Sequence, residues 1–434
     1  MKQRYTAIYS LLIILLIGFS ACSRTEDSLF DESAAIRLSQ SISEITDFMQ
    51  SAENGWIFEY FPNDESAGVV YIVDFTSAKE ATMASINPYM PTYKEAQGYW
   101  RVISDMGPVL TFDTYNEIFH IFSDPIDPES GSSDGVGLGG DYEFLVVAVT
   151  DDEIILKGKK NGNISSLRKL AIGQDWEAYL NELKVMSQNI FGQNIVPLQL
   201  VVNNELLMTL KNGGKSHIFT TIPAGGNEID DADAMPFLVT DNGIRLTNPL
   251  IVGDKSIRSF KLADDGNSLI GIDEGVDAII QAIAPEELLM AIVEQKKYMM
   301  LTNDSSSMSI PILDAYNLLD QAVVGRDRKT DHIGFMIEKN LGFSLAISTS
   351  KGASKAEGHI GFDYDIVDNR VQLSRNDNIN TNGANLINNF EAGSIIALLE
   401  GIYQVSALGA NLASTTLKFV DINDTNKWFT LTMP

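Results

Sequence analysis

The sequence predicts an α+β protein, mainly of antiparallel β-strands, in two β-rich halves that are each introduced by an amphipathic helix. Two observations lead to this prediction. Short runs of aromatic and β-branched residues alternate with turn formers along most of the chain, which is typical of strands joined by short connections. Residues 35–49 and 176–190 instead repeat apolar side chains every three or four positions, which is the period of a helix.

The chain begins with a segment that predicts export and a lipid anchor. Two basic residues and an apolar run over residues 7–19 lead through Ser20 and Ala21 to Cys22, the single cysteine of the 434 residues. The run is shorter than the roughly 20 apolar residues of a membrane-spanning helix but suits the core of a secretory signal. We therefore expect residues 1–21 to be a lipoprotein signal peptide and Cys22 to be lipidated, with an ordinary secretory signal as the alternative.

The charge of the chain excludes some classes of partner. It has 58 acidic and 31 basic residues and a formal net charge of −27. Such a surface repels the phosphates of nucleic acid and anionic lipid headgroups, so we expect no nucleic-acid partner. Residues 22–31 are polar and acidic and are expected to form a tether. Removal of residues 1–21 leaves 413 residues, which is enough for more than one hydrophobic core.

Residues 32–173 are expected to fold as a helix followed by an antiparallel sheet. One face of the helix is lined by Ala35, Leu38, Ile42, Ile45 and Met49. A sheet of seven short strands with short connections can curl into a barrel. The expected strands are residues 56–61, 69–75, 99–103, 109–112, 118–122, 142–149 and 153–158.

Residues 174–434 are expected to form a C-terminal α+β region that repeats this layout. Its first helix carries an apolar stripe of Trp176, Tyr179, Leu180, Leu183 and Ile190. Further helices are expected over residues 284–299 and 312–324, and a last one has a face of Ile395, Leu398, Leu399 and Ile402. The expected strands are residues 195–210, 217–221, 236–240, 243–247, a strand around 335, 343–349, 360–366, 370–374, 416–420 and 428–432.

Several motifs, most of them in the first half, carry a resemblance to a known family. They are Asn54-Gly55-Trp56 with Tyr60, Gly98-Tyr99-Trp100, Leu110 to Asn116 with His120, Asp124-Pro125, Gly140 to Phe144, and Leu156 to Lys160. In this order they resemble the Bacteroidetes lipoprotein family catalogued as domain of unknown function 4302. The resemblance implies an outer-membrane lipoprotein, often associated with a TonB-dependent receptor and a SusD-like protein, and it implies no catalytic residues.

The same motifs supply the candidate binding residues, which are Asp113, Tyr115, Asn116, His120 and Asp141. Their side chains could line a cleft at the ends of strands. The alternative is structural, because Asp and Asn side chains that flank strands often close turns by bonding nearby backbone. No residue qualifies as catalytic, since no nucleophile has an evident base beside it in a recognisable motif.

A short histidine motif occurs twice, as His332 to Phe335 and as His359 to Phe362. If the two segments form neighbouring strands, their imidazoles could face each other and hold a metal or a carboxylate; a purely structural hairpin is the alternative. No two histidines lie three or four residues apart, and the only cysteine belongs to the anchor, so we expect neither a metal site nor a cofactor.

These observations favour a non-enzymatic binding or accessory protein, lipid-anchored at the outer membrane, that serves nutrient uptake with a TonB-dependent receptor. The cell surface is the expected location, with the periplasmic face as the alternative. Two other functions stay open. One is a glycan or peptide hydrolase that uses carboxylates such as Asp113 and Asp141. The other is a lipocalin-like carrier, which a closed barrel with a deep apolar cavity would support.

Overall fold

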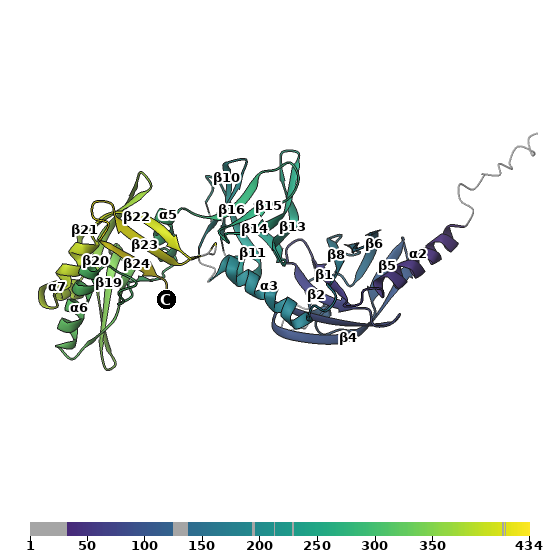
Figure 1. Cartoon of the computed structure of the whole chain (residues 1–434), viewed down its shortest axis with the longest axis horizontal. Helices are drawn as coiled ribbons and strands as arrows, with labels where there is room; N and C mark the ends of the chain where they lie inside the picture. The colour runs from purple at the N-terminus through teal and green to yellow at the C-terminus, as the bar shows by residue number, and fades with distance from the viewer. Residues whose placement is uncertain are drawn as a thin grey trace, which may run out of the picture.

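The protein is a row of antiparallel barrels (Figure 1). The computed structural model describes residues 33–124, 138–192, 196–211, 213–227, 230–409, 412 and 414–434. Within these ranges the chain forms three closed barrels of eight strands each. This confirms an α+β fold that is mainly antiparallel and barrel-like. The expected signal peptide, Cys22 and the tether over residues 22–31 lie outside the described residues.

The first barrel follows helix α2 (Ala34–Met49), whose last turn packs on the barrel core. The indole of Trp56 donates to the carbonyl oxygen of Met49 at 2.7 Å and so fixes the helix to the first strand. Aromatic rings fill the interior, including those of Phe58, Tyr60 and Tyr71. The strands are β1 (Trp56–Tyr60), β2 (Val69–Asp74), β3 (Glu80–Asn87), β4 (Met90–Ser104), β5 (Pro108–Phe112), β6 (Glu143–Val149), β7 (Glu153–Gly158) and β8 (Ile164–Lys169), and β8 pairs with β1.

The expected strand over residues 118–122 is wrong. The side-chain oxygen of Asn116 accepts the backbone N–H groups of Ile118 at 3.1 Å and Phe119 at 3.2 Å, which starts a helical turn. A 3-10 helix, η1 (His120–Phe122), follows. The apolar side chains that suggested a strand pack instead into the core of the barrel, and all of Ile118, Phe119, Ile121 and Phe122 are buried.

The second barrel follows helix α3 (Trp176–Phe191). The single strand expected over residues 195–210 is a hairpin, because Asn203 and Asn204 have positive φ angles of 50° and 65° and form a tight turn. A four-residue helix, α4 (Gly213–Ser216), precedes the third strand. The strands are β9 (Leu198–Val202), β10 (Glu205–Lys211), β11 (Ile218–Pro223), β12 (Asp233–Val239), β13 (Gly243–Val252), β14 (Lys255–Leu262), β15 (Ser268–Gly271) and β16 (Ala278–Ala282).

The third barrel shows that residues 174–434 hold two barrels rather than one β-rich half. Its helices are α5 (Pro285–Val293), α6 (Ile310–Val324), α7 (Thr381–Asn389) and α8 (Ala392–Leu399). Helix α5 is shorter than expected, and Ile402 lies on a strand instead of on the last helix. The strands are β17 (Met299–Met300), β18 (Lys329–Glu338), β19 (Gly342–Lys351), β20 (Ser354–Val367), β21 (Arg370–Ile379), β22 (Gly401–Leu408), β23 (Thr416–Asp421) and β24 (Trp428–Thr432).

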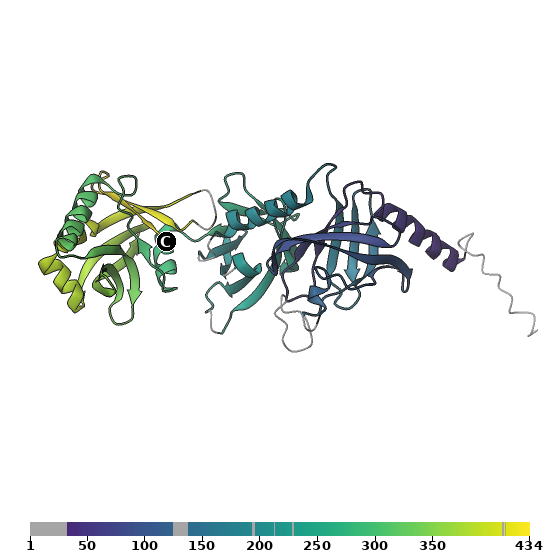
Figure 2. The same ribbon diagram turned by 90° about the horizontal axis from the view of Figure 1, so that it is seen from below.

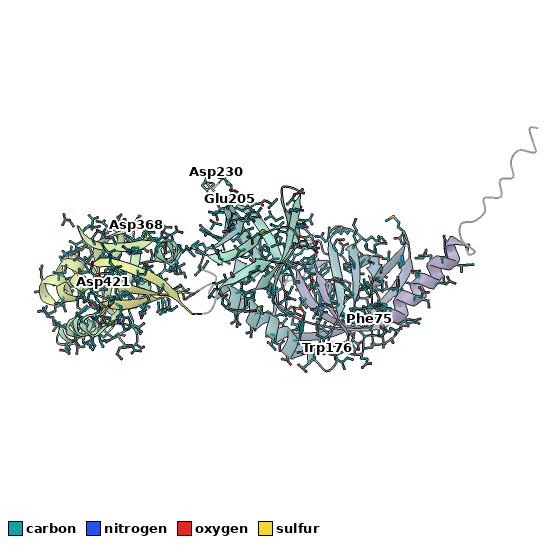
Figure 3. All side chains as sticks on the ribbon, turned by 45° about the horizontal axis from the view of Figure 1, so that its top comes forward. Phe75, Trp176, Glu205, Asp230, Asp368 and Asp421 are labelled. Atoms are coloured by element: carbon teal, nitrogen blue, oxygen red, sulfur yellow. The ribbon has the colours of Figure 1, made fainter. Side chains whose placement is uncertain are left out.

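Helix α3 runs along the junction of the first two barrels (Figures 1 and 2). Its apolar face packs against the outer side of β1, β2 and β3 in one buried cluster that also includes Leu238 of β12. At the start of the helix, Trp176 lies against the first barrel and its indole donates to the carbonyl oxygen of Asn54 at 3.1 Å (Figure 3). Buried Glu59 pairs with Arg245 across the same junction. The first two barrels are therefore joined by a shared core.

Candidate functional site

A pocket of about 350 Å³ lies at the junction of the first two barrels. This volume is near the lower end of the range for small-molecule sites, roughly 300–1,000 Å³, and domain junctions are a common place for such sites. The pocket is formed by β2, β3, α3, β12 and the segments next to them. Its lining residues are Gly68, Val69, Val70, Ile86, Asn87, Pro88, Pro91, Leu183, Lys184, Ser187, Gln188, Gly214, His217, Leu238 and Val239.

The walls of the pocket are mainly apolar. Ile86 and Leu238 come from different barrels, and Leu183 of α3 lies between them in the same hydrophobic cluster. Two prolines, Pro88 and Pro91, extend this surface. Most of these walls come from strands and a helix, and an apolar group that enters the pocket leaves water, which favours its binding.

Ser187 and His217 form a hydrogen-bonded pair in the pocket lining, and because they are less exposed than Lys184 and Gln188, their part of the pocket is called its inner end. The hydroxyl oxygen of buried Ser187 lies 3.0 Å from Nε2 of His217. The ring of His217 stacks on Phe237 with a centroid distance of 5.4 Å. Desolvation lowers the pKa of His217 to about 4. The imidazole is therefore neutral at pH 7, and its Nε2 can either donate to or accept from the serine hydroxyl.

The backbone of His217 is strained. Its φ angle is +54°, in the left-handed region that a residue with a Cβ adopts at a cost of about 1 kcal/mol. Its carbonyl oxygen accepts the N–H of Phe237 at 2.9 Å, which ties the strained residue to β12. Backbone strain of this kind is concentrated at binding sites, where it aims a side chain that a relaxed backbone would point elsewhere.

The mouth of the pocket is lined by exposed polar side chains of α3. Lys184 and Gln188 lie one helical turn apart on the face that also carries Ser187. The Lys184 ammonium donates to the carbonyl oxygen of Pro91 at 3.1 Å. None of the described residues that line the pocket is acidic, although the chain has 58 acidic residues. Lys184 is thus the one formally charged group in this lining at pH 7.

The side chains of the predicted residues Asn116 and His120 form hydrogen bonds with the backbone of their own loop. Nδ1 of His120 accepts the backbone N–H of Asn116 at 3.0 Å, while the Asn116 side chain caps the following turn. Desolvation lowers the pKa of His120. Exposed Tyr115 stacks on the His120 ring with a centroid distance of 5.8 Å. These three residues lie together at the start of the segment that packs into the first barrel.

The two predicted carboxylates face different partners. Asp113 forms an ion pair with Arg101 at 2.6 Å. Asp141 accepts the backbone N–H groups of Lys160 at 2.6 Å and Asn161 at 2.9 Å, so it closes the turn after β7. Because both carboxylates are engaged and point to different elements, their geometry gives no support to a paired acid and base. None of the five predicted residues lines the pocket.

A family comparison covers this part of the molecule. The family described as "Domain of unknown function (DUF4302)" matches residues 26–264, which is more than half of the chain. The protein belongs to this DUF4302 family. The match includes the first barrel, α3 and the second barrel as far as β14. It therefore contains every residue that lines the pocket. No curated protein matches the DUF4302 chain.

Two solved structures are similar to parts of this DUF4302 protein at a low level. An uncharacterized protein from Bacteroides eggerthii has 15% identity and a TM-score of 0.17, over 27% of this chain and 100% of that chain. DNA polymerase III subunit beta from Borrelia burgdorferi, in complex with a natural product, has 9% identity and a TM-score of 0.13, over 92% of this chain and 97% of that one. Neither similarity supports an inference about function.

In the third barrel, one carboxylate contacts both histidine motifs. Strand β19 separates His332 on β18 from His359 on β20, but Glu357 reaches both. Its oxygens lie 3.2 Å from Nε2 of His332 and 3.4 Å from Nε2 of His359, and Tyr298 donates to it at 3.1 Å. Hydrogen bonds from His332 and His359 hold the pKa of Glu357 well below its usual range. Across the described residues, no cluster of three or more His, Cys, Asp or Glu side chains is arranged to hold a metal ion.

No sequence motif predicts the inter-barrel pocket, because its lining comes from segments up to 171 positions apart in the chain. One signal was present in α3. Leu180, Leu183 and Ile190 form its buried stripe, and Ser187 occupies the position of that stripe where another apolar side chain is expected. A polar residue on the buried face of a helix needs a partner, and here the partner is His217.

Proposed function

We propose that this protein is a lipoprotein, anchored by Cys22 at the outer face of the outer membrane, that binds a small, largely apolar ligand as an accessory of nutrient uptake through a TonB-dependent receptor and a SusD-like protein. The signal-like N-terminus, the acidic tether and the family resemblance support the location and the partners. Among the helices that the structure describes, none is long and apolar enough to cross a membrane.

The pocket between the first two barrels is the observation that carries the binding role. It combines apolar walls from two barrels with a strained, neutral histidine and a buried serine at its inner end. An apolar site with a few placed polar groups is the usual composition of a ligand pocket. A purely structural junction would be expected to fill this volume with side chains, as the interior of the first barrel is filled.

The same geometry favours binding over hydrolysis. A general base works best when its pKa lies near the working pH, and His217 has a pKa of about 4. None of the described lining residues is a carboxylate that could orient the imidazole and raise its basicity. Ser187 therefore lacks the activation that a nucleophile requires. The ligand also lies outside the barrels, in contrast to a lipocalin, because rings such as Phe58 and Phe144 occupy the first barrel.

A substitution at the mouth of the pocket tests the binding role. The Gln188→Trp variant places an indole over the opening, whereas Asn189→Trp adds the same side chain at the neighbouring exposed position, which does not line the pocket. A panel of small apolar and amphipathic compounds is screened for an increase in Tm. We expect compounds that stabilise the wild type and Asn189→Trp but not Gln188→Trp. The proposal is wrong if the stabilising compounds act equally on both variants, or if no compound acts.

A further inference from the structure

We infer that the ligand of the inter-barrel pocket is an amphipathic monocarboxylate, with its apolar body between the barrels and its carboxylate at Lys184 and Gln188 of α3. This inference rests on the proposed binding function and adds the chemical class of the ligand. It follows from the distribution of charge around the pocket, from the depth at which each polar group lies, and from the volume available.

The charge around the pocket is opposite to that of the whole chain. The protein has a formal net charge of −27, yet the one formally charged residue among the described lining residues is the cation Lys184. A ligand with a negative group thus meets an ammonium at the mouth and no carboxylate in the lining. A ligand with a positive group meets the ammonium without a compensating anion, and like charges in close contact disfavour its binding.

The donors at the mouth are suited to a carboxylate. Lys184 uses one N–H for the carbonyl oxygen of Pro91 at 3.1 Å, and an ammonium has three. Gln188, one turn further along α3, carries an amide NH₂ on the same face of the helix. Both side chains are exposed, so an anion between them keeps part of its hydration, and its desolvation cost is smaller than at a buried site.

The inner end of the pocket is suited to an uncharged part of the ligand. Ser187 and His217 already satisfy each other at 3.0 Å, and desolvation lowers the pKa of His217 to about 4, so the imidazole carries no charge at pH 7. Among the described side chains that line this end of the pocket, none is a cation that could pair with a carboxylate placed there. The body of the ligand therefore lies inward, against Leu183 and Leu238, and the charged group lies outward.

The volume limits the length of that body. At about 350 Å³ the pocket is near the lower limit of small-molecule sites, which fits a chain of roughly eight to twelve carbons or one substituted aromatic ring better than a long lipid. A single ammonium also matches a single negative charge. These two limits point to a medium-chain or aromatic monocarboxylic acid rather than to a phospholipid or a polyanion.

Three probes with the same chain and different head groups test this inference. Decanoate, decanol and decylamine are titrated calorimetrically into the full mature chain, which carries Cys22→Ala so that no detergent competes for them. We expect decanoate to bind at least tenfold more tightly than decanol and decylamine to bind most weakly. Lys184→Met should weaken decanoate about tenfold, leave decanol unchanged and reduce the dependence on salt. The matched control is Lys339→Met, which removes an exposed lysine of the third barrel.

The outcomes separate this inference from the function on which it rests. If decanol binds as tightly as decanoate, or if Lys184→Met and Lys339→Met have the same effect, the carboxylate assignment is overturned while ligand binding stands. The inference also fails if none of the three probes binds and no aromatic carboxylate such as phenylpropionate binds either. If no compound of the wider panel stabilises the protein, the proposed function itself is rejected. Because Lys184 is exposed, its replacement leaves the fold intact, and the decanol titration checks this directly.

Discussion

His217 combines three properties at one position. Its φ angle of +54° is strained, its ring is desolvated against Phe237, and its Nε2 is within hydrogen-bond distance of Ser187. Desolvation favours the neutral form of the imidazole, while the contact with Ser187 and the stacking on Phe237 fix the orientation of its ring. The stability of the first two barrels therefore depends on the protonation state of one side chain at the inner end of the pocket.

This linkage predicts a pH dependence of stability. The pKa of His217 is about 4 in the folded protein and about 6.5 in the unfolded chain. At a pH between these two values the unfolded state binds more protons at this position, so the free energy of unfolding falls as the pH is lowered. The stabilisation is complete above about pH 6.5 and is lost as the pH falls through about 4. We expect a loss of about 3 kcal/mol between pH 7 and pH 4, measured by chemical unfolding of the full mature chain.

The His217→Asn variant is the matched test, because Asn tolerates a positive φ and does not titrate. We expect its free energy of unfolding to depend less on pH than that of the wild type by this same amount. Other titrating groups contribute equally to both proteins and cancel in the difference. An identical pH dependence in the variant and the wild type would contradict the assignment of a neutral, desolvated histidine.

Individual side chains also explain which site residues could be predicted. The sequence offers Asn116 and Asp141 as binding residues or as turn-closing residues, and the structure shows backbone bonds of the second kind. The repeated histidine motif suggests neighbouring strands, but β19 lies between β18 and β20, and His332 and His359 are bridged instead by Glu357 of the chain itself. The contact between Ser187 and His217 could not be predicted, since it depends on how α3 packs against the second barrel.

At the scale of elements, α3 is the part that both barrels share. Asp175 caps its start by accepting the N–H of Ala178 at 2.8 Å, and its buried stripe packs against β1, β2 and β3. The helical period of this stripe was sufficient to predict the helix. Strands β3 and β8 were not predicted, because β3 is rich in Ala, Ser and Met and β8 has two serines, and these residues do not favour strands. Both segments form strands because each pairs with a neighbouring strand on both sides.

The shared helix predicts a large effect from one core substitution. Leu180 of α3 is fully buried in the cluster between the barrels and does not line the pocket. We expect Leu180→Ala to lower the free energy of unfolding by about 3 kcal/mol, through lost burial and the cavity that remains. Chemical denaturation of the full mature chain measures this. Val185→Ala, at an exposed position of the same helix, should change stability by less than about 0.5 kcal/mol, and equal effects of the two changes would contradict the role assigned to the stripe.

At the scale of the whole molecule, sequence patterns predicted the class of fold better than the number of barrels. The connection between β16 and α5 is short, and no polar or glycine-rich segment lies there to mark the boundary between the second and third barrels. The packing also crosses the boundary, because Leu412, in the loop between β22 and β23 of the third barrel, belongs to the core cluster of the second. A boundary covered in this way leaves no compositional signal.

The proposed anchor determines how the row of barrels meets the membrane. Helix α2 begins at Ala34, so about a dozen residues separate Cys22 from this helix, which leads into the first barrel at Trp56. Each buried CH₂ of an acyl chain contributes about 0.8 kcal/mol of membrane affinity. We therefore expect Cys22→Ala to move the protein from the outer-membrane fraction to the soluble fraction, whereas Ser23→Ala should leave it in the membrane. Retention of Cys22→Ala in the membrane fraction would reject the anchor.

The same pair of variants tests the partners, since a tether of this length holds the barrels close to neighbouring outer-membrane proteins. Mild crosslinking of intact cells, followed by purification of the protein, should recover a TonB-dependent receptor and a SusD-like protein with the wild type and with Ser23→Ala. Cys22→Ala should lose both, because release from the membrane removes the high local concentration that the anchor provides. If the wild type is recovered alone while a known receptor complex is crosslinked in the same cells, the pocket serves a solitary binding protein instead of an uptake complex.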